Sequence, residues 1–268
     1  MNNGAIEQLN TLVKRTVSSG VKPIELFFQP VFDCDYGEVR AYRANARINS
    51  LSVGVLESED YIDYSANDNL LIDFGHNVIS KTLFFLSALG NQPQIRFVSV
   101  ACPTSLIYDK NLYSYLKKAV FSNGDNAKKL CLEFSSSVTE IGGETLKSSL
   151  IDIKAAGIKT AINGYGGSAF SMEKLLTVCP DYLYCDKSLA SLTTDYEKSG
   201  AVAPVINLAK SLGANVIACG IENDMELREF RSRDAFGFIP EDDYKGSLEL
   251  TEKMFAADNF LKWGEQDD

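Results

Sequence analysis

The chain has 268 residues, of which 45% are hydrophobic, and a formal net charge of −10. This length fits one barrel domain, and this hydrophobic content excludes wholesale disorder. The negative charge argues against a general nucleic-acid-binding protein, which needs a basic surface to replace counterions, but it is compatible with a small anionic ligand held by one or two arginines.

The six cysteines have no CxxC spacing, and several lie in apolar runs such as KLCLEF. Buried, reduced thiols of a cytoplasmic protein are the favoured interpretation, with a disulfide framework or a zinc site as the alternative. The opening segment, MNNGAIEQLN, is polar and does not resemble a signal peptide. The longest apolar stretch, Leu70–Leu89, contains Asp73, His76 and Lys81, so it predicts an amphipathic helix and not a membrane span.

Residues 1–22 are predicted to form a lead-in segment with a short helix at about 6–18. Strand-length runs rich in Val, Ile, Phe and Tyr follow. They are Ile24–Phe32, Val39–Ile48, Ile95–Cys102, Leu130–Ser135, Ile158–Asn163, Tyr182–Asp186, Asn215–Cys219 and Ala235–Ile239. The gaps predict helices at Asp60–Leu89, Ser105–Phe121, Glu144–Ala156, Ser171–Val178 and Val202–Leu212, and a last helix is expected at Leu248–Trp263. The gap before the last strand is too short for a helix.

The spacing of these elements predicts the topology. The first two strands are joined only by DCDYGE, a turn of hairpin length, so they should be antiparallel. The later strands alternate with helices, which indicates parallel strands with right-handed crossovers. The order predicts an α/β fold, a TIM-type (β/α) barrel with an antiparallel strand at its start, which occupies residues 23–268 as a single domain. An open, doubly wound sheet is the structural alternative.

In such a barrel, the chemistry lies at the carboxyl ends of the parallel strands. The residues expected there are Ala101, Glu133, Ser136, Asn163, Gly164, Tyr184, Asp186, Cys219, Glu222 and Phe236. Few of them are acidic. A metal-dependent phosphodiesterase needs several convergent carboxylates, because two divalent ions need neutralising ligands and must activate a water. This end of the barrel is therefore poor in metal ligands.

Several segments resemble, in matching order, the motifs of one known protein family. IELFFQPVFDCDYGEVRAYRANARI is similar to the family's opening, where a QPI run and a DxxTG-like turn precede the EAL signature. FVSVACP resembles the strand that ends in asparagine, and LCLEFSSSVTE resembles the LxLEITES strand. GIKTAINGYGGSAFSMEKLLTVCPDYLYCDKSLA resembles, without a gap, the DDFGTGYSS loop and the KID strand, and LAKSLGANVIACGIEN resembles the approach to the AEGVE motif. These segments together resemble the EAL domain family, whose members hydrolyse cyclic di-GMP. The resemblance runs from about Leu9 to Pro240 and implies the barrel fold.

The resemblance implies that most of the family's acidic site is replaced. The signature glutamate, a metal ligand, corresponds to Arg43, and the metal-binding asparagine corresponds to Ala101. The two DDFG aspartates correspond to Asn163 and Gly164, and the catalytic lysine corresponds to Tyr184. The remaining replacements are Ser136 for the second glutamate of LxLEITES, Cys219 for the first glutamate of AEGVE and Phe236 for the glutamine of QGY.

Three family positions are kept. Glu133 matches the ligand glutamate of LxLEITES, Glu222 matches the second glutamate of AEGVE, and Arg47 matches an arginine that contacts a ligand phosphate in the family. Arg43 places a permanent positive charge where a divalent cation should lie. We therefore expect no metal and no cofactor. We hypothesise that Arg43 pairs with Glu133 in place of the metal; the alternative is that Arg43 points to solvent and Glu133 is hydrated.

The leading hypothesis for function is a catalytically inactive, EAL-like regulatory protein that acts through contacts with an unidentified protein partner. The alternative is a non-hydrolysing receptor for cyclic di-GMP, supported by Arg47 and Glu222. An active cyclic di-GMP phosphodiesterase is third, since fold analogy alone supports it. Self-association as a homodimer is compatible with the resemblance, because many family members dimerise. Neither the only histidine, His76, nor Cys219 is expected to be catalytic.

Overall fold

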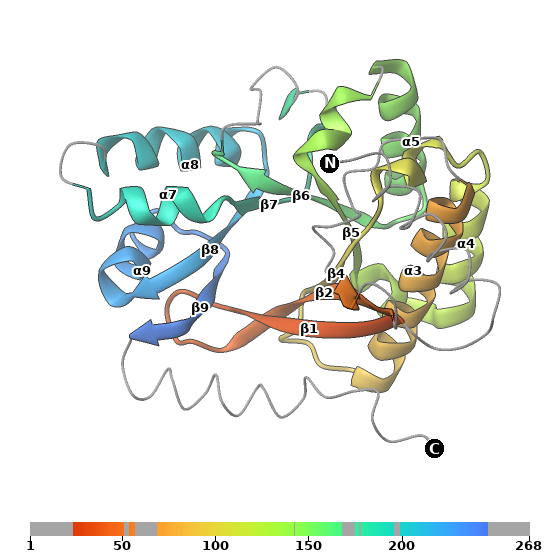
Figure 1. The fold of residues 1–268 in the computed structure, drawn as a ribbon, viewed down its shortest axis with the longest axis horizontal. Coiled ribbons are helices and arrows are strands. Elements are labelled where there is room, and N and C mark those ends of the chain that lie inside the picture. Colours follow the sequence, from red (N-terminus) through yellow and green to blue (C-terminus); the bar gives the residue numbers. More distant parts are fainter. Residues whose placement is uncertain are drawn as a thin grey trace.

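The computed structural model describes residues 24–50, 54–56, 69–141, 143–167, 175–176, 178–195 and 199–245. Neighbouring strands follow the order β1-β9-β8-β7-β6-β5-β4-β2, and a pairing of β1 with β2 closes the ring, with β3 attached to the far side of β2 (Figure 1). The strands are β1 (Ile24–Phe32), β2 (Val39–Ser50), β3 (Gly54–Leu56), β4 (Phe97–Ala101), β5 (Leu130–Ser135), β6 (Lys159–Tyr165), β7 (Tyr182–Cys185), β8 (Asn215–Asn223) and β9 (Gly237–Lys245).

Helices surround this barrel on the outside. Figure 1 shows α3, α4 and α5 on one side of it and α7, α8 and α9 on the other. The helices are α3 (Asn69–Leu89), α4 (Leu112–Asn123), α5 (Gly143–Ala155), α7 (Lys187–Leu192), α8 (Val202–Ser211) and α9 (Asp224–Arg231), with 3₁₀ turns η1 (Thr104–Tyr108), η2 (Gly124–Lys129), η3 (Ser136–Glu140) and η4 (Ser199–Ala201). Among the described residues, no helix combines the length and the apolar character that a membrane crossing requires.

The predicted topology is confirmed. β1 and β2 form an antiparallel hairpin, and β2, β4, β5, β6, β7, β8 and β9 pair in parallel, each with the next. The hairpin turn depends on Asp33, whose Oδ1 accepts hydrogen bonds from the backbone N–H groups of Asp35 and Tyr36 at 2.9 and 2.6 Å. Gly37 follows with φ of 66°, a conformation that favours glycine. The fold is therefore a TIM-type barrel with one antiparallel strand at its start, and not an open sheet.

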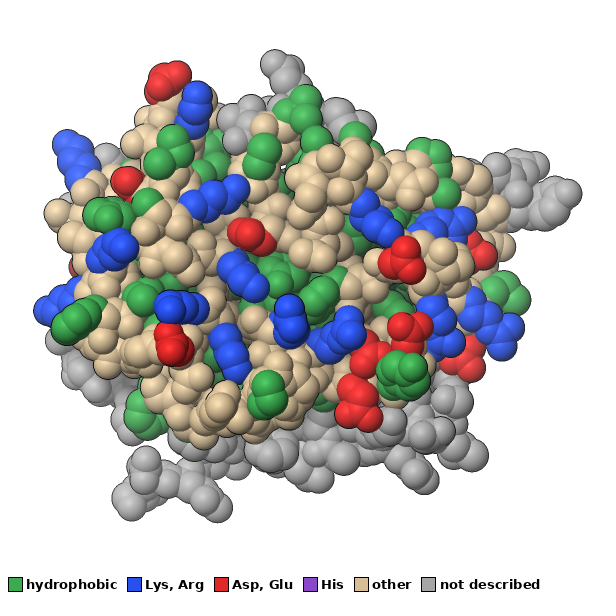
Figure 2. All heavy atoms as spheres, turned by 180° about the vertical axis from the view of Figure 1, so that it is seen from behind, with side chains coloured by type: hydrophobic (Ala, Val, Ile, Leu, Met, Phe, Trp, Pro, Cys, Tyr) green, Lys and Arg blue, Asp and Glu red, His purple; other side chains and the backbone are tan. Residues whose placement is uncertain are grey.

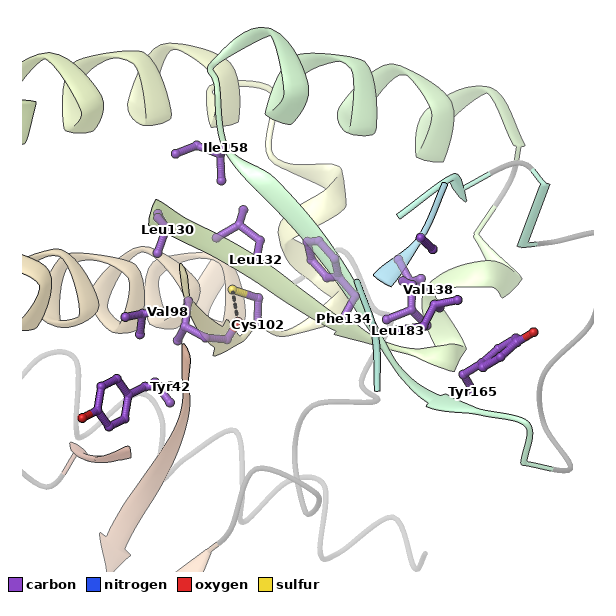
Figure 3. Close-up of a cluster of buried hydrophobic side chains, with 14 of the residues drawn as sticks. Tyr42, Val98, Cys102, Leu130, Leu132, Phe134, Val138, Ile158, Tyr165 and Leu183 are labelled. Atoms are coloured by element: carbon purple, nitrogen blue, oxygen red, sulfur yellow. Dashed lines mark hydrogen bonds between the residues drawn. The ribbon is translucent and has the colours of Figure 1, made fainter. Parts of the chain in front are cut away.

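The alternation of side chains along each strand separates two apolar layers. The residues that fill the barrel interior are Val31, Ala41, Phe97, Cys131, Ala161, Tyr182, Tyr184, Ile217 and Ile239. The outer layer lies between the strands and the helices. Figure 3 shows part of it, where Leu130, Leu132 and Phe134 of β5 lie on the outer side of the sheet. The interior layer contains few residues. The side chains beyond it, at the carboxyl ends of the strands, line the mouth of the barrel.

The structure corrects the predicted elements at several points. The gap before β9 does contain a helix, α9, because Asn223 ends β8 and directly caps the helix: its Oδ1 accepts from the N–H groups of Met225 and Glu226 at 3.0 and 3.1 Å. The single helix expected at 105–121 is divided into η1 and α4, because Asp109 forms a turn by accepting from the N–H of Asn111 at 2.8 Å. The short elements β3 and α7 were not predicted.

Other predictions lie partly or wholly outside the described residues. They concern the lead-in helix at 6–18, the first part of the helix at 60–89, most of the helix at 171–178 and the last helix at 248–263. The described part of the helix predicted at 60–89 is α3, which is helical as predicted. The boundaries of β1 and β5 coincide with the predicted ones, and the other predicted strands differ by a few residues at one or both ends.

Candidate functional site

The candidate site lies inside the barrel, at neighbouring positions of four strands. Arg43 of β2 lies opposite Ser99 of β4, and Ala101 of β4 lies opposite Glu133 of β5. Tyr184 of β7 completes the group from the other side of the barrel. These positions alternate with residues that face the helices, such as the buried Phe134. The sequence pattern thus brings one cation, one carboxylate and two hydroxyl groups together in the interior.

Arg43 and Glu133 form the predicted ion pair. The Arg43 Nη2 atom lies 2.5 Å from Glu133 Oε1, and Arg43 Nε lies 3.0 Å from both carboxylate oxygens. Glu133 is 1% exposed as a residue, whereas the Arg43 side chain keeps 16% exposure. Burial on its own lowers the pKa of Arg43, but the charge and hydrogen bonds of Glu133 outweigh it, so that pKa lies above its ordinary value. The pair is therefore charged, bidentate and largely shielded from water.

Ser99 hydrogen-bonds Glu133, and Tyr184 in turn hydrogen-bonds Ser99. The Ser99 hydroxyl donates to Glu133 Oε2 at 3.1 Å, and Tyr184 Oη lies 2.7 Å from Ser99 Oγ, which leaves Tyr184 as the donor of that second bond. The guanidinium of Arg43 lies over the Tyr184 ring, 4.8 Å from its centre. Burial, with Glu133 nearby, holds the pKa of Tyr184 well above its ordinary value. Tyr184 is therefore a neutral phenol at the position where the family resemblance expects a lysine.

Sequence reasoning did not identify Ser99. A usable signal existed, because Ser99 lies two residues before Ala101 on the same strand and so shares its face of β4. It was overlooked because the family comparison directs attention to positions that are charged in active members.

The residues present do not fit the divalent metal of the family. Mg²⁺ and Mn²⁺ require several oxygen ligands, among them carboxylates. Around Glu133 the neighbours are instead a guanidinium, a serine hydroxyl, a phenol and the methyl group of Ala101. In the described part of the chain, no three or more His, Cys, Asp and Glu side chains are grouped in a way that could hold a metal ion. We therefore derive no chemical step through a metal.

The replaced positions on β5 and β6 bring small neutral groups to the mouth. Ser136 begins η3 directly after β5, and Asn163 lies near the end of β6; both are half-buried. Gly164 has φ of 84°, and a Cβ atom built there would lie 3.9 Å from Ser136 Oγ. This side of the mouth therefore offers an amide and a hydroxyl group in place of the carboxylates that the family resemblance expects.

Cys219 of β8 is half-buried next to the interior cluster. Burial raises its pKa to about 12, although the positive charge of Arg43 acts in the opposite direction. The thiol is thus protonated near neutral pH, which disfavours a nucleophilic role. His76 lies on α3 outside the barrel, where Nε2 contacts Asp109 Oδ2 at 2.8 Å and the ring stacks on Tyr115 at 4.0 Å. It has no contact with Cys219.

The two kept positions outside the ion pair are separate from it. Arg47 follows Arg43 by four residues on the same face of β2, and its guanidinium lies over the Phe27 ring at 4.0 Å. Glu222 is exposed, near the end of β8, where its backbone N–H donates to Glu226 Oε2 at 2.8 Å. The structure thus places Arg47 at the mouth above the ion pair, and Glu222 on the surface.

Phe236 is not at the carboxyl end of the barrel, so its expected place was wrong. It precedes the first residue of β9 and packs against residues that begin their strands, Phe97 of β4 and Tyr182 of β7, at 5.7 and 5.3 Å between ring centres. These contacts put Phe236 at the amino-terminal end of the barrel. The prediction failed because it relied on the loosest part of the family resemblance.

Comparison with known proteins adds the family. The EAL domain model matches residues 15–238. An uncharacterized signaling protein of Caulobacter vibrioides is 22% identical over 223 residues, which make up 82% of this chain and 27% of that protein. The "Probable cyclic di-GMP phosphodiesterase PdeI" of Escherichia coli is 19% identical over 227 residues, which make up 82% of this chain and 29% of that protein. The chain spans less than a third of the length of these two relatives.

A solved structure agrees with the sequence match. The EAL enzyme Bd1971, in the form with cAMP and cyclic di-GMP bound, has a TM-score of 0.75 and 22% identity, covering 94% of this chain and 69% of that one. At this identity the likeness shows the fold. Since the family model covers most of the chain, this protein belongs to the EAL domain family.

Proposed function

We propose that this EAL domain protein does not hydrolyse cyclic di-GMP and acts as a regulator through contacts with another protein. One observation carries the proposal: the bidentate pair of Arg43 and Glu133 lies at positions that correspond to metal ligands in the family. We place the protein in the cytoplasm, where its six free cysteines would stay reduced.

The physical argument concerns what a divalent ion would have to displace. To reach the Glu133 oxygens it must break the ion pair and then lie beside a guanidinium of the same sign. Removing the partner of a buried charge costs about 3–5 kcal/mol, before any repulsion is counted. Tyr184, a neutral phenol, also replaces the cationic lysine of the family resemblance. A hydrolytic site would need changes at several of these positions together.

The second candidate is a receptor that binds cyclic di-GMP without hydrolysis. The observation in its favour is Arg47, whose guanidinium stacks on Phe27 at the barrel mouth. A stacked arginine presents its N–H edge in a fixed orientation, which suits a phosphate. The structurally similar EAL enzyme Bd1971 has been solved with cAMP and cyclic di-GMP bound. Arg43 would contribute less, because Glu133 already neutralises it.

Titration calorimetry with cyclic di-GMP, alone and with Mg²⁺ or Mn²⁺, separates these candidates when the nucleotide is also analysed by chromatography. The proposal predicts neither heat nor product in any arm. Heat without metal identifies the receptor and displaces the first candidate, and an Arg47→Gln variant then tests whether this arginine carries the binding. Product that forms only with metal contradicts both candidates.

A further inference from the structure

The amino-terminal end of the barrel, opposite the candidate site, carries a row of cations on neighbouring parallel strands. They are Arg40 near the start of β2, Arg96 directly before β4, Lys129 directly before β5 and Lys159 at the start of β6, and we call them the basic rim. Parallel strands begin at the same edge of a sheet, so these side chains gather at one end. A backbone bond from the Arg96 N–H to Arg40 O, at 2.7 Å, holds two of these positions together.

The basic rim is weakly neutralised within the part of the chain that the structure describes. No carboxylate of that part pairs with Arg96, Lys129 or Lys159, and Arg40 Nε lies 4.0 Å from Asp33 Oδ2. Lys129 Nζ donates to a backbone carbonyl at 2.8 Å, and Lys159 Nζ donates to Tyr182 Oη at 3.2 Å. Arg96 is exposed, and the Arg40 side chain keeps 48% exposure. The rim thus presents positive charge to solvent.

An aromatic floor lies inside the basic rim. Phe97 and Tyr182 lie 4.0 Å apart between ring centres, and the half-buried Phe236 contacts both. Two rim cations lie near these rings, with Arg40 at 5.8 Å from the Phe236 centre and Lys159 at 5.4 Å from the Tyr182 centre. Phe97 and Tyr182 are buried, so the half-buried Phe236 provides the apolar contact, while the cations around it offer charge-assisted hydrogen bonds.

The charges on this face are unevenly distributed. Figure 2, in which the molecule is seen from behind, shows Lys and Arg side chains around hydrophobic ones in the middle of the face. Asp and Glu side chains are most numerous toward the lower right edge, with single ones elsewhere on the face, including among the central cations. The β1–β2 turn contributes Asp35 and Glu38, both exposed, next to Tyr36 at 78% exposure. A positive area of this kind is unexpected on a chain with a net charge of −10. Its location follows from the strand starts and not from overall composition.

We propose that the basic rim and its aromatic floor form the docking surface for an acidic segment of a protein partner, a segment that also carries an aromatic side chain. The carboxylates would contact Arg96 and Lys159 while the aromatic ring packs on Phe236. A long polyanion such as duplex nucleic acid fits less well, because it would extend over the acidic edge and meet a chain of the same sign. This inference rests on the proposed function in one respect: the proposed function requires a contact with a partner protein, and the inference says which surface makes that contact. It is independent of what binds at the barrel mouth.

A fluorescein-labelled peptide with glutamates on both sides of two phenylalanines is the probe, and anisotropy is the readout. We expect saturable binding that weakens as salt is raised, and no binding of a matched peptide with glutamine for each glutamate. The double variant Arg96→Gln/Lys159→Gln should lower the affinity about fivefold to tenfold. The control Lys118→Gln/Lys147→Gln removes two exposed cations of α4 and α5 and should bind as the parent protein does.

Several results would overturn the docking proposal. They are equal binding of the glutamine peptide, equal loss in the control variant, and tighter binding of a labelled DNA duplex than of the peptide. Sedimentation also measures the oligomeric state: a dimer of the parent protein that is lost in Arg96→Gln/Lys159→Gln would assign the surface to a second copy of this chain. Failure of the proposed function is seen separately: turnover of cyclic di-GMP with intact peptide binding refutes that function alone. Absent turnover with no peptide binding refutes only the docking surface.

Discussion

The cations at the two ends of the barrel differ in their burial and in their carboxylate partners. At the carboxyl end, Arg43 is neutralised by a glutamate that is 1% exposed and hydrogen-bonded by Ser99. At the amino-terminal end, Arg96 is exposed and pairs with no carboxylate among the described residues. A buried, satisfied pair contributes to the folded state and closes a site, whereas exposed cations contribute little to stability and are free to meet a partner. The difference separates a buried, neutralised position from an end of the barrel where positive charge reaches solvent.

The largest expected difference concerns thiol reactivity at the two ends. The pKa of Cys219 is raised to about 12 by burial, so at pH 8 about one side chain in ten thousand is a reactive thiolate. Cys179 precedes β7 at the other end and is exposed. Treatment with iodoacetamide followed by peptide mass spectrometry should label Cys179 long before Cys219, with Cys219 labelling accelerating as pH rises. Early labelling of Cys219 at pH 8 would show that the mouth is open to water.

The next effect tests the ion pair through stability. Arg43→Met leaves the carboxylate of Glu133 buried without its cation, which should lower the free energy of unfolding by about 3–5 kcal/mol. Urea denaturation measures this loss. The double variant Arg43→Met/Glu133→Leu removes both charges and should recover most of it. A loss below about 1 kcal/mol in the single variant would mean that the pair is not held as described.

A smaller effect is expected for the hydroxyl that supports the pair. Tyr184→Phe removes the donor to Ser99 but keeps the ring below the Arg43 guanidinium. The free energy of unfolding should fall by about 1–2 kcal/mol, since a buried acceptor loses its partner. Thermal and urea unfolding measure this loss. The control is Tyr165→Phe, which removes a hydroxyl that is bonded to a backbone carbonyl on the outer side of the barrel. A neutral result would remove Tyr184 from the network.

The smallest effect is expected at the basic rim. Arg96→Gln/Lys159→Gln should change the free energy of unfolding by less than about 1 kcal/mol, because neither cation has a carboxylate partner among the described residues. Arg96 is exposed, and the half-buried Lys159 loses one long hydrogen bond to Tyr182 Oη. The same urea assay applies. A loss as large as that of Arg43→Met would show that these cations are structural, and the contrast between the two ends would then disappear.

Sequence reasoning went further at the carboxyl end than at the amino-terminal end. The barrel followed from strand spacing. The pair of Arg43 with Glu133 followed from the family resemblance, which puts both residues at metal-ligand positions, and β4 lies between their strands. Ser99 was overlooked, since a serine within a strand carries no spacing signal of its own. The position of Phe236 was wrong because it was taken from the family resemblance, although the predicted strand Ala235–Ile239 already placed this residue near its start.

The basic rim was not predicted either, for a physical reason. Its members are far apart in the sequence and come together only because parallel strands begin at one edge. Net charge and local composition average over such an arrangement, and the chain as a whole is acidic. The residue before each predicted strand recovers Lys129 but not Arg96, which lies inside the predicted strand Ile95–Cys102. Only the observed start of β4 at Phe97 and the closed barrel show that the two cations are neighbours.

Titration of the protein with Mn²⁺ in the presence of cyclic di-GMP, followed by chromatography of the nucleotide, tests the central claim most directly. The claim is that the guanidinium of Arg43 occupies the position of the family's metal and holds Glu133. It predicts no saturable uptake of Mn²⁺ and no product above a protein-free blank. Saturable uptake with turnover that Glu133→Gln abolishes would contradict it.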